Sequence, residues 1–154
     1  MSHTMEIDTA PHAMHRFPLR VYYEDTDAAG VVYYANYLKF AERARTEALR
    51  QLGWGQSQMK AQHGVVFVVH QCAAKFLQPA RLDDALVVHT AVQRLGRARL
   101  SMLQKLYRNG TLLVTMEVDL AIVDADLRPA RTPKEVHAAL ARWAAAVPAG
   151  ETSA

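Results

Sequence analysis

Three acidic side chains stand within four positions near the start of the chain, where residues 22–38 read YYEDTDAAGVVYYANYL. They are Glu24, Asp25 and Asp27, and two alanines, Gly30 and a short apolar and aromatic run follow them. A helical pattern begins directly afterwards. A carboxylate before a glycine turn and a helix start can act as a general base or a nucleophile, and the free N–H groups of the helix start can stabilise an oxyanion. A solvated acidic turn would also satisfy this pattern.

The stretch after this segment has the apolar spacing of one long helix over residues 36–52. The apolar positions recur at three- and four-residue steps: Tyr37, Ala41, Ala44, Ala48 and Leu52. Because the face is mostly alanine, the helix can approach another surface closely, as it would under a sheet that wraps around it. Gly53 is expected to end the helix.

The other elements are expected to be strands and one short helix. The strands are valine-rich or alternate between apolar and polar residues, over residues 17–23 before the long helix and 63–77, 85–95, 99–107 and 112–123 after it. Asn109-Gly110 predicts a tight hairpin before the last strand, because both residues tolerate positive φ. Thr132-Pro133-Lys134-Glu135 predicts a capping box that opens a helix ending near Ala146.

Together these elements predict an α+β domain. A long curved antiparallel sheet wraps around one central helix, with a short helix at the C-terminal end. We expect the domain over residues 16–147, a disordered leader over residues 1–15 and a frayed tail over residues 148–154. Long strands around one helix leave the edges and one face of the sheet uncovered, which predicts that copies of the chain associate.

Composition excludes several classes of protein. The net charge of +3 over 154 residues comes without a dense Lys/Arg stripe, which argues against nucleic acid as a partner. No apolar stretch is long enough to span a bilayer as an integral membrane segment, and the start of the chain lacks a signal-peptide core. The single cysteine, Cys72, rules out an internal disulfide, fits a reducing compartment and is expected to be buried and inert. His70 and Cys72 could share a strand face, but two ligands do not make a metal site.

Four stretches of the chain resemble the hot-dog fold acyl-CoA thioesterases. They read RVYYEDTDAAGVVYYANYLKFAERARTEALR, VVFVV, PARLDDALVV and RPARTPKEV, and they extend in this order from Arg20 to Val136. Within this fold the chain is similar to the 4-hydroxybenzoyl-CoA thioesterase-like branch, and most similar to the acyl-CoA thioesterase encoded with the Tol–Pal cell-envelope system. The resemblance implies a hot-dog fold and a cytoplasmic hydrolase that splits acyl-CoA into a free acid and coenzyme A without metal or redox cofactor.

The resemblance also assigns catalytic positions. The family's catalytic carboxylate is the second acid of a D-x-D pair followed two positions later by A-G, which corresponds to Asp27 and Gly30. The backbone amide that polarises the thioester carbonyl falls near Tyr34. Close relatives often carry histidine in place of Tyr34, but a backbone N–H does not depend on the side chain. Asp27 would either attack the carbonyl to form an anhydride or activate a water, and the sequence leaves both routes open.

Further positions are candidates for binding the substrate. They are Tyr33, Asn36 and Val66 for the acyl group and Arg97, Arg99 and Arg131 for the phosphates of coenzyme A. Arginine binds phosphate through a planar fork of donors, although solvated surface arginines would look the same. Asn36 could instead cap the helix, and Glu24 and Asp25 are expected to support the turn.

Two alternative functions remain open from the sequence. A thioesterase for acyl carrier protein would share Asp27 but would need a basic surface for an acidic partner. A non-catalytic scaffold could use the same pocket to bind acyl-CoA without hydrolysing it. The family resemblance further implies a homodimer or homotetramer with the active site at the subunit interface.

Overall fold

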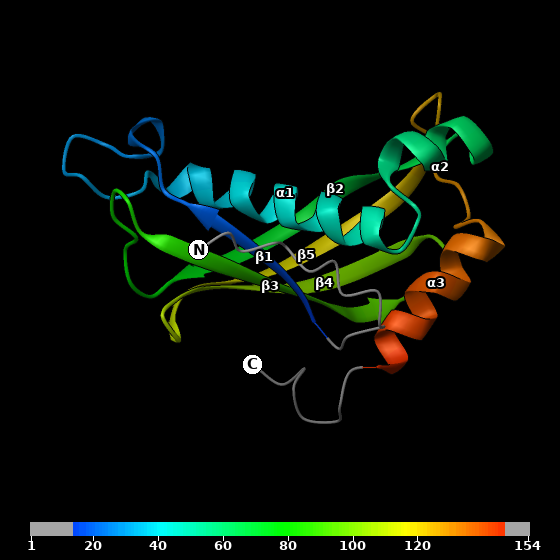
Figure 1. Ribbon diagram of the computed structural model, residues 1–154. Helices are drawn as coiled ribbons and strands as arrows, with labels where there is room; N and C mark the ends of the chain where they lie inside the picture. Colours follow the sequence, from blue (N-terminus) through cyan, green and yellow to red (C-terminus); the bar gives the residue numbers. More distant parts are fainter. Residues whose placement is uncertain (1–13, 147–154) are drawn as a thin grey trace.

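The computed structural model describes residues 14–146 of the chain, and within them five strands form one antiparallel sheet in the order β1-β3-β4-β5-β2 (Figure 1). The strands are β1 His15–Arg20, β2 Val65–Phe76, β3 Ala85–Leu95, β4 Arg99–Arg108 and β5 Thr111–Asp124. The helices are α1 Tyr34–Gln51, α2 Gln56–His63 and α3 Lys134–Ala145. The predicted α+β class and the long antiparallel sheet are therefore confirmed. The leader and the tail expected from the sequence lie outside the described residues, except for Met14 and His15.

The long helix α1 runs lengthwise across one face of the curved sheet (Figure 1). Four of the five positions of the predicted face are buried: Tyr37, Ala41, Ala44 and Ala48. Two larger apolar side chains, Phe40 and Leu49, are buried as well. Leu52, the fifth predicted position, follows the last turn and is only half-buried. The alanines let α1 lie close to the sheet, while Phe40 and Leu49 supply most of the apolar volume.

The strands follow the alternation of the sequence. In β5 the side chains that face α1 are almost fully buried: Val114, Met116, Val118, Leu120 and Ile122. The hairpin between β4 and β5 turns at Asn109 and Gly110, whose φ angles are 47° and 80°. Both values lie in the left-handed region, as the predicted tight turn requires.

One polar cluster lies inside this otherwise apolar layer. Gln104 of β4 is 0% exposed, and its amide nitrogen donates to the carbonyl of Ala41 at 2.9 Å and to the hydroxyl of Thr90 at 3.0 Å. Its amide oxygen accepts from the Arg45 guanidinium at 2.9 Å. Burial lowers the pKa of Arg45, and the carboxylate of Glu42 raises it in part. Gln104, on β4, thus ties α1 to β3 through buried hydrogen bonds. Losing one of them would leave a buried polar group unsatisfied, which is costly.

The helix α2 was not predicted, and the strand expected from residue 63 begins later. His63 is the last residue of α2, Gly64 ends the helix with φ of 66°, and β2 starts at Val65. Only Met59 is buried in α2. A short polar helix with a single buried position carries no periodic signal that the sequence could have shown.

The capping box predicted at Thr132 is wrong. Pro133 is the N-cap of α3, in an extended conformation with ψ of 145°, and no side chain caps the helix. The backbone N–H of Thr132 donates to the carbonyl of Arg97 at 2.8 Å, so the chain is held to the β3–β4 hairpin and turns into the helix only after Pro133. The Glu135 carboxylate lies 3.7 Å from Nε2 of His63 instead.

Strand β1 begins at His15, which the sequence placed in the leader. His15 pairs with Thr90 of β3, and its Nδ1 atom is buried without a hydrogen-bond partner among the described residues. Burial lowers the pKa of His15, and the nearby Glu47 carboxylate raises it in part. His15 is therefore a partly buried side chain of the sheet rather than part of a disordered leader.

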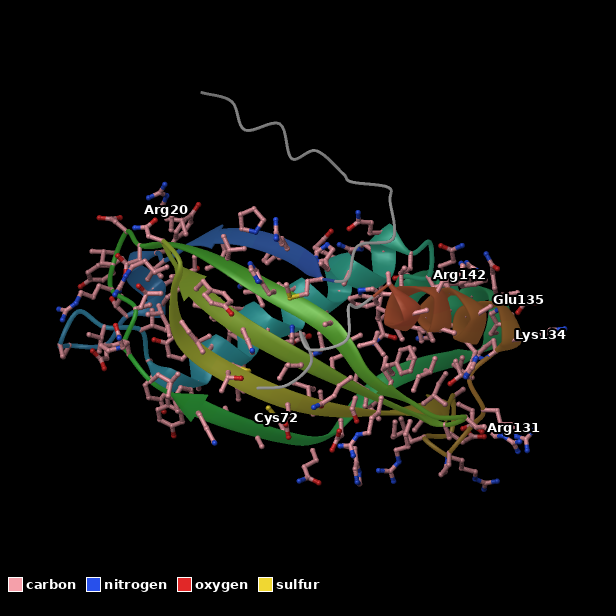
Figure 2. All side chains as sticks on the ribbon, turned by 90° about the horizontal axis from the view of Figure 1, so that it is seen from below. Arg20, Cys72, Arg131, Lys134, Glu135 and Arg142 are labelled. Carbon is pink, nitrogen blue, oxygen red and sulfur yellow. The ribbon has the colours of Figure 1, made fainter. Side chains whose placement is uncertain are left out.

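The other edge of the sheet, β2, is long and open. Its side chains are exposed on both faces along most of the strand, including Val69 at 52% and Phe76 at 49%. Cys72 lies on this edge and is exposed (Figure 2), which corrects the expectation of a buried cysteine. The sequence could not predict this exposure, because the same apolar run occurs in central strands and in edge strands.

Replacing Gln104 should test the polar cluster. We expect Gln104→Met to lower the free energy of unfolding by about 2–4 kcal/mol, because it leaves buried groups of Arg45, Thr90 and Ala41 without their partner. Chemical denaturation at fixed protein concentration measures the effect. The control Gln58→Met, on an exposed position of α2, should change stability by less than about 0.5 kcal/mol. Equal effects of the two substitutions would contradict the role of the cluster.

Candidate active site

The acidic segment folds as a turn that Asp25 holds together. Oδ2 of Asp25 accepts a hydrogen bond from the backbone N–H of Tyr22 at 2.8 Å. The carbonyl of Asp25 accepts from the N–H of Tyr33 at 3.0 Å and from Nδ2 of Asn36 at 2.8 Å. Asp25 therefore has the structural role predicted for it. Asn36 does not cap the helix but ties its first turn to this carbonyl.

Asp27 lies on the next turn with its carboxylate exposed. The turn closes through bonds from Asp27 N–H to the Val31 carbonyl at 2.9 Å and from Gly30 N–H to the Asp27 carbonyl at 3.0 Å. Oδ1 of Asp27 accepts from Ala29 N–H at 2.9 Å. Gly30 has φ of 78°, a conformation that side chains with a Cβ rarely adopt. One carboxylate oxygen is thus used to orient the group, and the other has no hydrogen-bond partner in residues 14–146.

The helix α1 begins a few residues later, at Tyr34. Tyr33 is the N-cap, and no side chain caps this end. The N–H of Asn36 donates to the Tyr33 carbonyl at 2.8 Å, whereas the N–H groups of Tyr34 and Ala35 have no backbone acceptor among the described residues. Unsatisfied amides at the positive end of a helix attract negative charge. A carboxylate and two amides without a backbone acceptor in the described residues therefore belong to one short stretch of chain.

Aromatic side chains surround this helix start. The rings of Tyr33 and Tyr34 are 4.8 Å apart between centroids, and Tyr34 makes an edge contact with Phe76 at 6.1 Å. Tyr33, Tyr34 and Phe76 thus form an aromatic wall. Tyr37 lies on its buried side, with its ring centroid 5.7 Å from that of Phe76. A hydrogen bond with Tyr34 raises the pKa of the Tyr33 phenol. The wall is neutral and mostly apolar, as a surface for an acyl group requires.

The remaining predicted binding residues lie at the other end of the sheet. Val66 is at the start of β2, whereas Tyr34 contacts Phe76 at its end. Arg97 and Arg99 are exposed on the β3–β4 hairpin, and Arg131 precedes α3 at the same end (Figure 2). The twelve residues of β2 span roughly 36–40 Å at about 3.3 Å each. Within one chain the structure therefore does not bring these four residues to Asp27.

Neither a metal centre nor a membrane helix is found in residues 14–146. No group of three or more His, Cys, Asp or Glu side chains there could hold a metal ion. Among the same residues, no helix is long and apolar enough to cross a membrane. His70 and Cys72 both lie on β2, without a third ligand beside them in the part of the chain that the structure describes.

Sequence reasoning missed two contacts behind the site. The Tyr37 hydroxyl accepts a hydrogen bond from the backbone N–H of Ala80 at 2.9 Å. Oδ2 of Asp84 accepts from Arg108 and from the N–H of Arg81, both at 2.8 Å. Partial burial acts to raise the pKa of Asp84, but these hydrogen bonds and the two guanidinium charges lower it overall. No local sequence pattern predicts contacts between residues so far apart. The one available signal was Asp84 itself, an acidic residue in the loop between the strands expected over residues 63–77 and 85–95.

Known proteins are similar to this chain in sequence and in overall fold. A family model described as "Thioesterase-like superfamily" matches residues 21–140. The "Acyl-CoA thioesterase YbgC" of Haemophilus influenzae is 47% identical over 124 residues, 80% of this chain and 91% of that protein. A crystal structure of "Probable Thioesterase from Bartonella henselae" is 38% identical, with a TM-score of 0.76 over 79% of this chain and 100% of that one.

A more distant structure supports the fold alone. It is a mutant 4-hydroxybenzoyl CoA thioesterase in complex with 4-hydroxybenzoyl CoA, 20% identical with a TM-score of 0.78. The match covers 83% of this chain and 99% of that one. The curved sheet around α1 is thus the hot-dog fold that the sequence predicted.

Gly30 offers a direct test of the turn. A Cβ at Gly30 would meet nothing within 4 Å, so its cost is conformational alone. We expect Gly30→Ala to lower the free energy of unfolding by about 1 kcal/mol, because its φ is strained for an L-residue. Gly96→Ala is the control, since Gly96 lacks a positive φ and a Cβ there makes only ordinary contacts. Thermal or chemical unfolding of both variants measures the difference, and a neutral Gly30→Ala would contradict the turn geometry.

Proposed function

This chain belongs to the thioesterase-like superfamily, and we propose that Asp27 and the start of α1 carry its reaction, the hydrolysis of acyl-CoA thioesters to a free acid and coenzyme A. The observation that carries the proposal is the stretch from Asp27 to Tyr34, which holds both an oriented carboxylate and the first amides of α1, which have no backbone acceptor in residues 14–146. Both groups are needed for acyl transfer, one to deliver a nucleophile and one to stabilise the oxyanion. The exposed thiol of Cys72 is compatible with the cytoplasm, which we propose as the compartment.

In the first step a nucleophile adds to the thioester carbonyl. The nucleophile is either the free oxygen of the Asp27 carboxylate or a water that Asp27 deprotonates. The tetrahedral intermediate collapses, the carbon–sulfur bond breaks, and coenzyme A leaves as a thiolate that takes up a proton. If Asp27 attacked directly, the product of this step is a mixed anhydride, which a water then splits to release the acid and restore the carboxylate. Each route consumes one water.

The amide N–H of Tyr34 is our candidate for the oxyanion donor. It belongs to the first turn of an 18-residue helix, where the aligned peptide dipoles favour negative charge. A backbone donor on a packed helix is held in place before the reaction, so little reorganisation is needed as the charge develops. The Tyr34 ring, exposed by 60%, is free to contact the acyl group together with Tyr33.

We further propose that two copies of the chain pair through their β2 edges. A long unpaired edge with exposed apolar side chains is a template for another strand, and antiparallel pairing of β2 with itself gives a closed two-fold dimer. The two-fold axis lays the start of the partner's β2 beside the end of β2 in the first chain. Val66 of the partner subunit would then approach the wall at Phe76.

The same two-fold symmetry would bring the three candidate arginines of one chain toward the site of the other. The hairpin and the segment before α3 lie at the end of the sheet where β2 starts, so pairing moves them toward the Asp27 end of the other chain. The partner's Arg97, the partner's Arg99 and the partner's Arg131 could then bind the phosphates of coenzyme A. This arrangement gives a function to residues that lie far from Asp27 within one chain, and it accommodates a dimer or a tetramer built from dimers.

Removing the Asp27 charge tests the catalytic assignment. We expect Asp27→Asn to fold normally and to lose at least about 100-fold in kcat, because the amide can serve as neither base nor nucleophile. Thiol release from a panel of aliphatic and aromatic acyl-CoAs measures kcat. Glu24→Gln is the matched control, since Glu24 is an exposed acid three positions before Asp27, and it should keep near-native turnover. An Asp27→Asn variant with native kcat would overturn the assignment.

Charging the β2 edge tests the dimer. We expect the unmodified chain to sediment as a dimer or larger, and Val69→Asp to raise the dissociation constant by at least about 100-fold, because pairing would bury an unpaired carboxylate. Leu127→Asp is the control, since Leu127 is 74% exposed in the loop after β5. Sedimentation velocity over a range of concentrations distinguishes the variants. A monomeric unmodified chain, or a dimer that Val69→Asp leaves intact, would refute pairing through β2.

A further inference from the structure

The stretch that connects Asp27 to α1 belongs to no helix and to no named strand. Its inner bonds close the turn at Gly30, but they do not fix the turn relative to the rest of the fold. Asn36 binds the Asp25 carbonyl before the turn. After the turn, the N–H of Val32 donates to the carbonyl of Ala80 at 2.8 Å, with a neighbouring bridge between Val31 and Arg81. The position of the Asp27 turn therefore depends on the segment 77–84.

Tyr37 binds the backbone of the same residue, Ala80, through its other polar group. Ala80 is 0% exposed, and its N–H donates to the Tyr37 hydroxyl at 2.9 Å, while its carbonyl accepts from Val32. Tyr37 lies on α1, within the first turn after Tyr34, and is 3% exposed. Burial raises the pKa of the Tyr37 phenol, although the bond from Ala80 lowers it in part. The backbone of Ala80 is thus held on both sides, by the Asp27 turn through its carbonyl and by α1 through its N–H.

An ion pair anchors the far end of the segment. Arg108, at the end of β4, donates to Oδ2 of Asp84 at 2.8 Å and to the Pro79 carbonyl at 3.2 Å. The same carboxylate oxygen accepts from Arg81 N–H, and the Asp84 carbonyl accepts from Val21 at 2.9 Å. The pair therefore ties both ends of residues 79–84 to the sheet. Its side chains are only one-fifth to one-quarter exposed, 21% for Asp84 and 27% for Arg108.

We infer that Tyr37 and the Arg108–Asp84 pair are positioning residues for the reaction. They touch neither the reacting atoms nor the substrate, but through Ala80 and Val32 they set the distance between the Asp27 carboxylate and the Tyr34 amide. The inference rests on the proposed function of Asp27. Reaction rates depend steeply on such distances, since a displacement of about 1 Å can cost on the order of 100-fold.

Deleting one oxygen tests the inference. We expect Tyr37→Phe to reduce kcat by about 10-fold or more, with KM changed less than about two-fold, because the pocket wall is kept while the clamp is lost. Hydrogen–deuterium exchange followed by NMR on the unliganded protein should show faster exchange at the amides of Ala80 and Val32. Tyr107→Phe is the matched control: its ring centroid lies 4.7 Å from that of His89 with the rings tilted by 42°, and its hydroxyl has no hydrogen-bond partner in residues 14–146.

The ion pair gives a second, independent variant. Asp84→Asn keeps the shape of the side chain but removes its charge, and it should lower kcat in the same direction and speed exchange at Ala80. A fall in melting temperature with unchanged kcat in both variants would show a merely structural role and overturn the inference. Unchanged exchange at Ala80 and Val32 in Tyr37→Phe would overturn it as well.

The two proposals fail in different ways. If Asp27→Asn kept its turnover while Tyr37→Phe lost it, the catalytic role of Asp27 would fall and the clamp would be shown to position another group of the same turn. If Asp27→Asn were inactive and Tyr37→Phe were fully active, the catalytic role would stand and the positioning role would fall.

Discussion

The hydrogen bond from Val32 to the Ala80 carbonyl is the contact on which the arrangement of the site depends. Residues 26–33 have no helix or strand of their own, and each loop residue that is held in one conformation costs about 1–2 kcal/mol of entropy. The fold offsets this cost by placing the stretch against a second loop that is itself tied to the sheet by Arg108 and to α1 by Tyr37. Asp27 can therefore stay exposed to substrate while its backbone is fixed from behind.

The sequence predicted those elements whose signal is periodic. The alanine face of α1 and the alternation of β5 are found in the structure, because each of these elements has one side that is buried and one that is more exposed. Three features could not be predicted. The helix α2 buries only Met59. At Thr132, a backbone hydrogen bond to Arg97 forms in place of the expected capping box. The exposure of Cys72 depends on the position of β2 at the edge of the sheet. Each is decided by a contact with a distant segment rather than by local propensity.

The site divides in the same way. Asp27, Gly30 and Tyr34 come from one continuous motif, so a family resemblance could assign them together. The contacts that hold them join Tyr37 to a residue 43 positions away and Asp84 to one 24 positions away. Such pairs leave no mark in the spacing of a single sequence. Gln104 is a related case, since a polar residue in an alternating apolar strand looks like an interruption until its three partners are seen.

A continuous motif for the chemistry and scattered residues for binding follow from the topology. The nucleophile and the oxyanion donor must keep a fixed distance, which a short stretch of one chain ending in a helix provides. A long acyl-CoA needs a surface much larger than one helix start, and within residues 14–146 the exposed edge strand β2 ends beside that start, at Phe76. An edge of this length is a liability for a monomer. Pairing it with a second copy would remove the liability and supply the missing wall, so the same strand would serve both stability and substrate binding. In such a dimer, acyl specificity would be set by residues of two chains, and it could change without any change in the Asp27–Tyr34 motif.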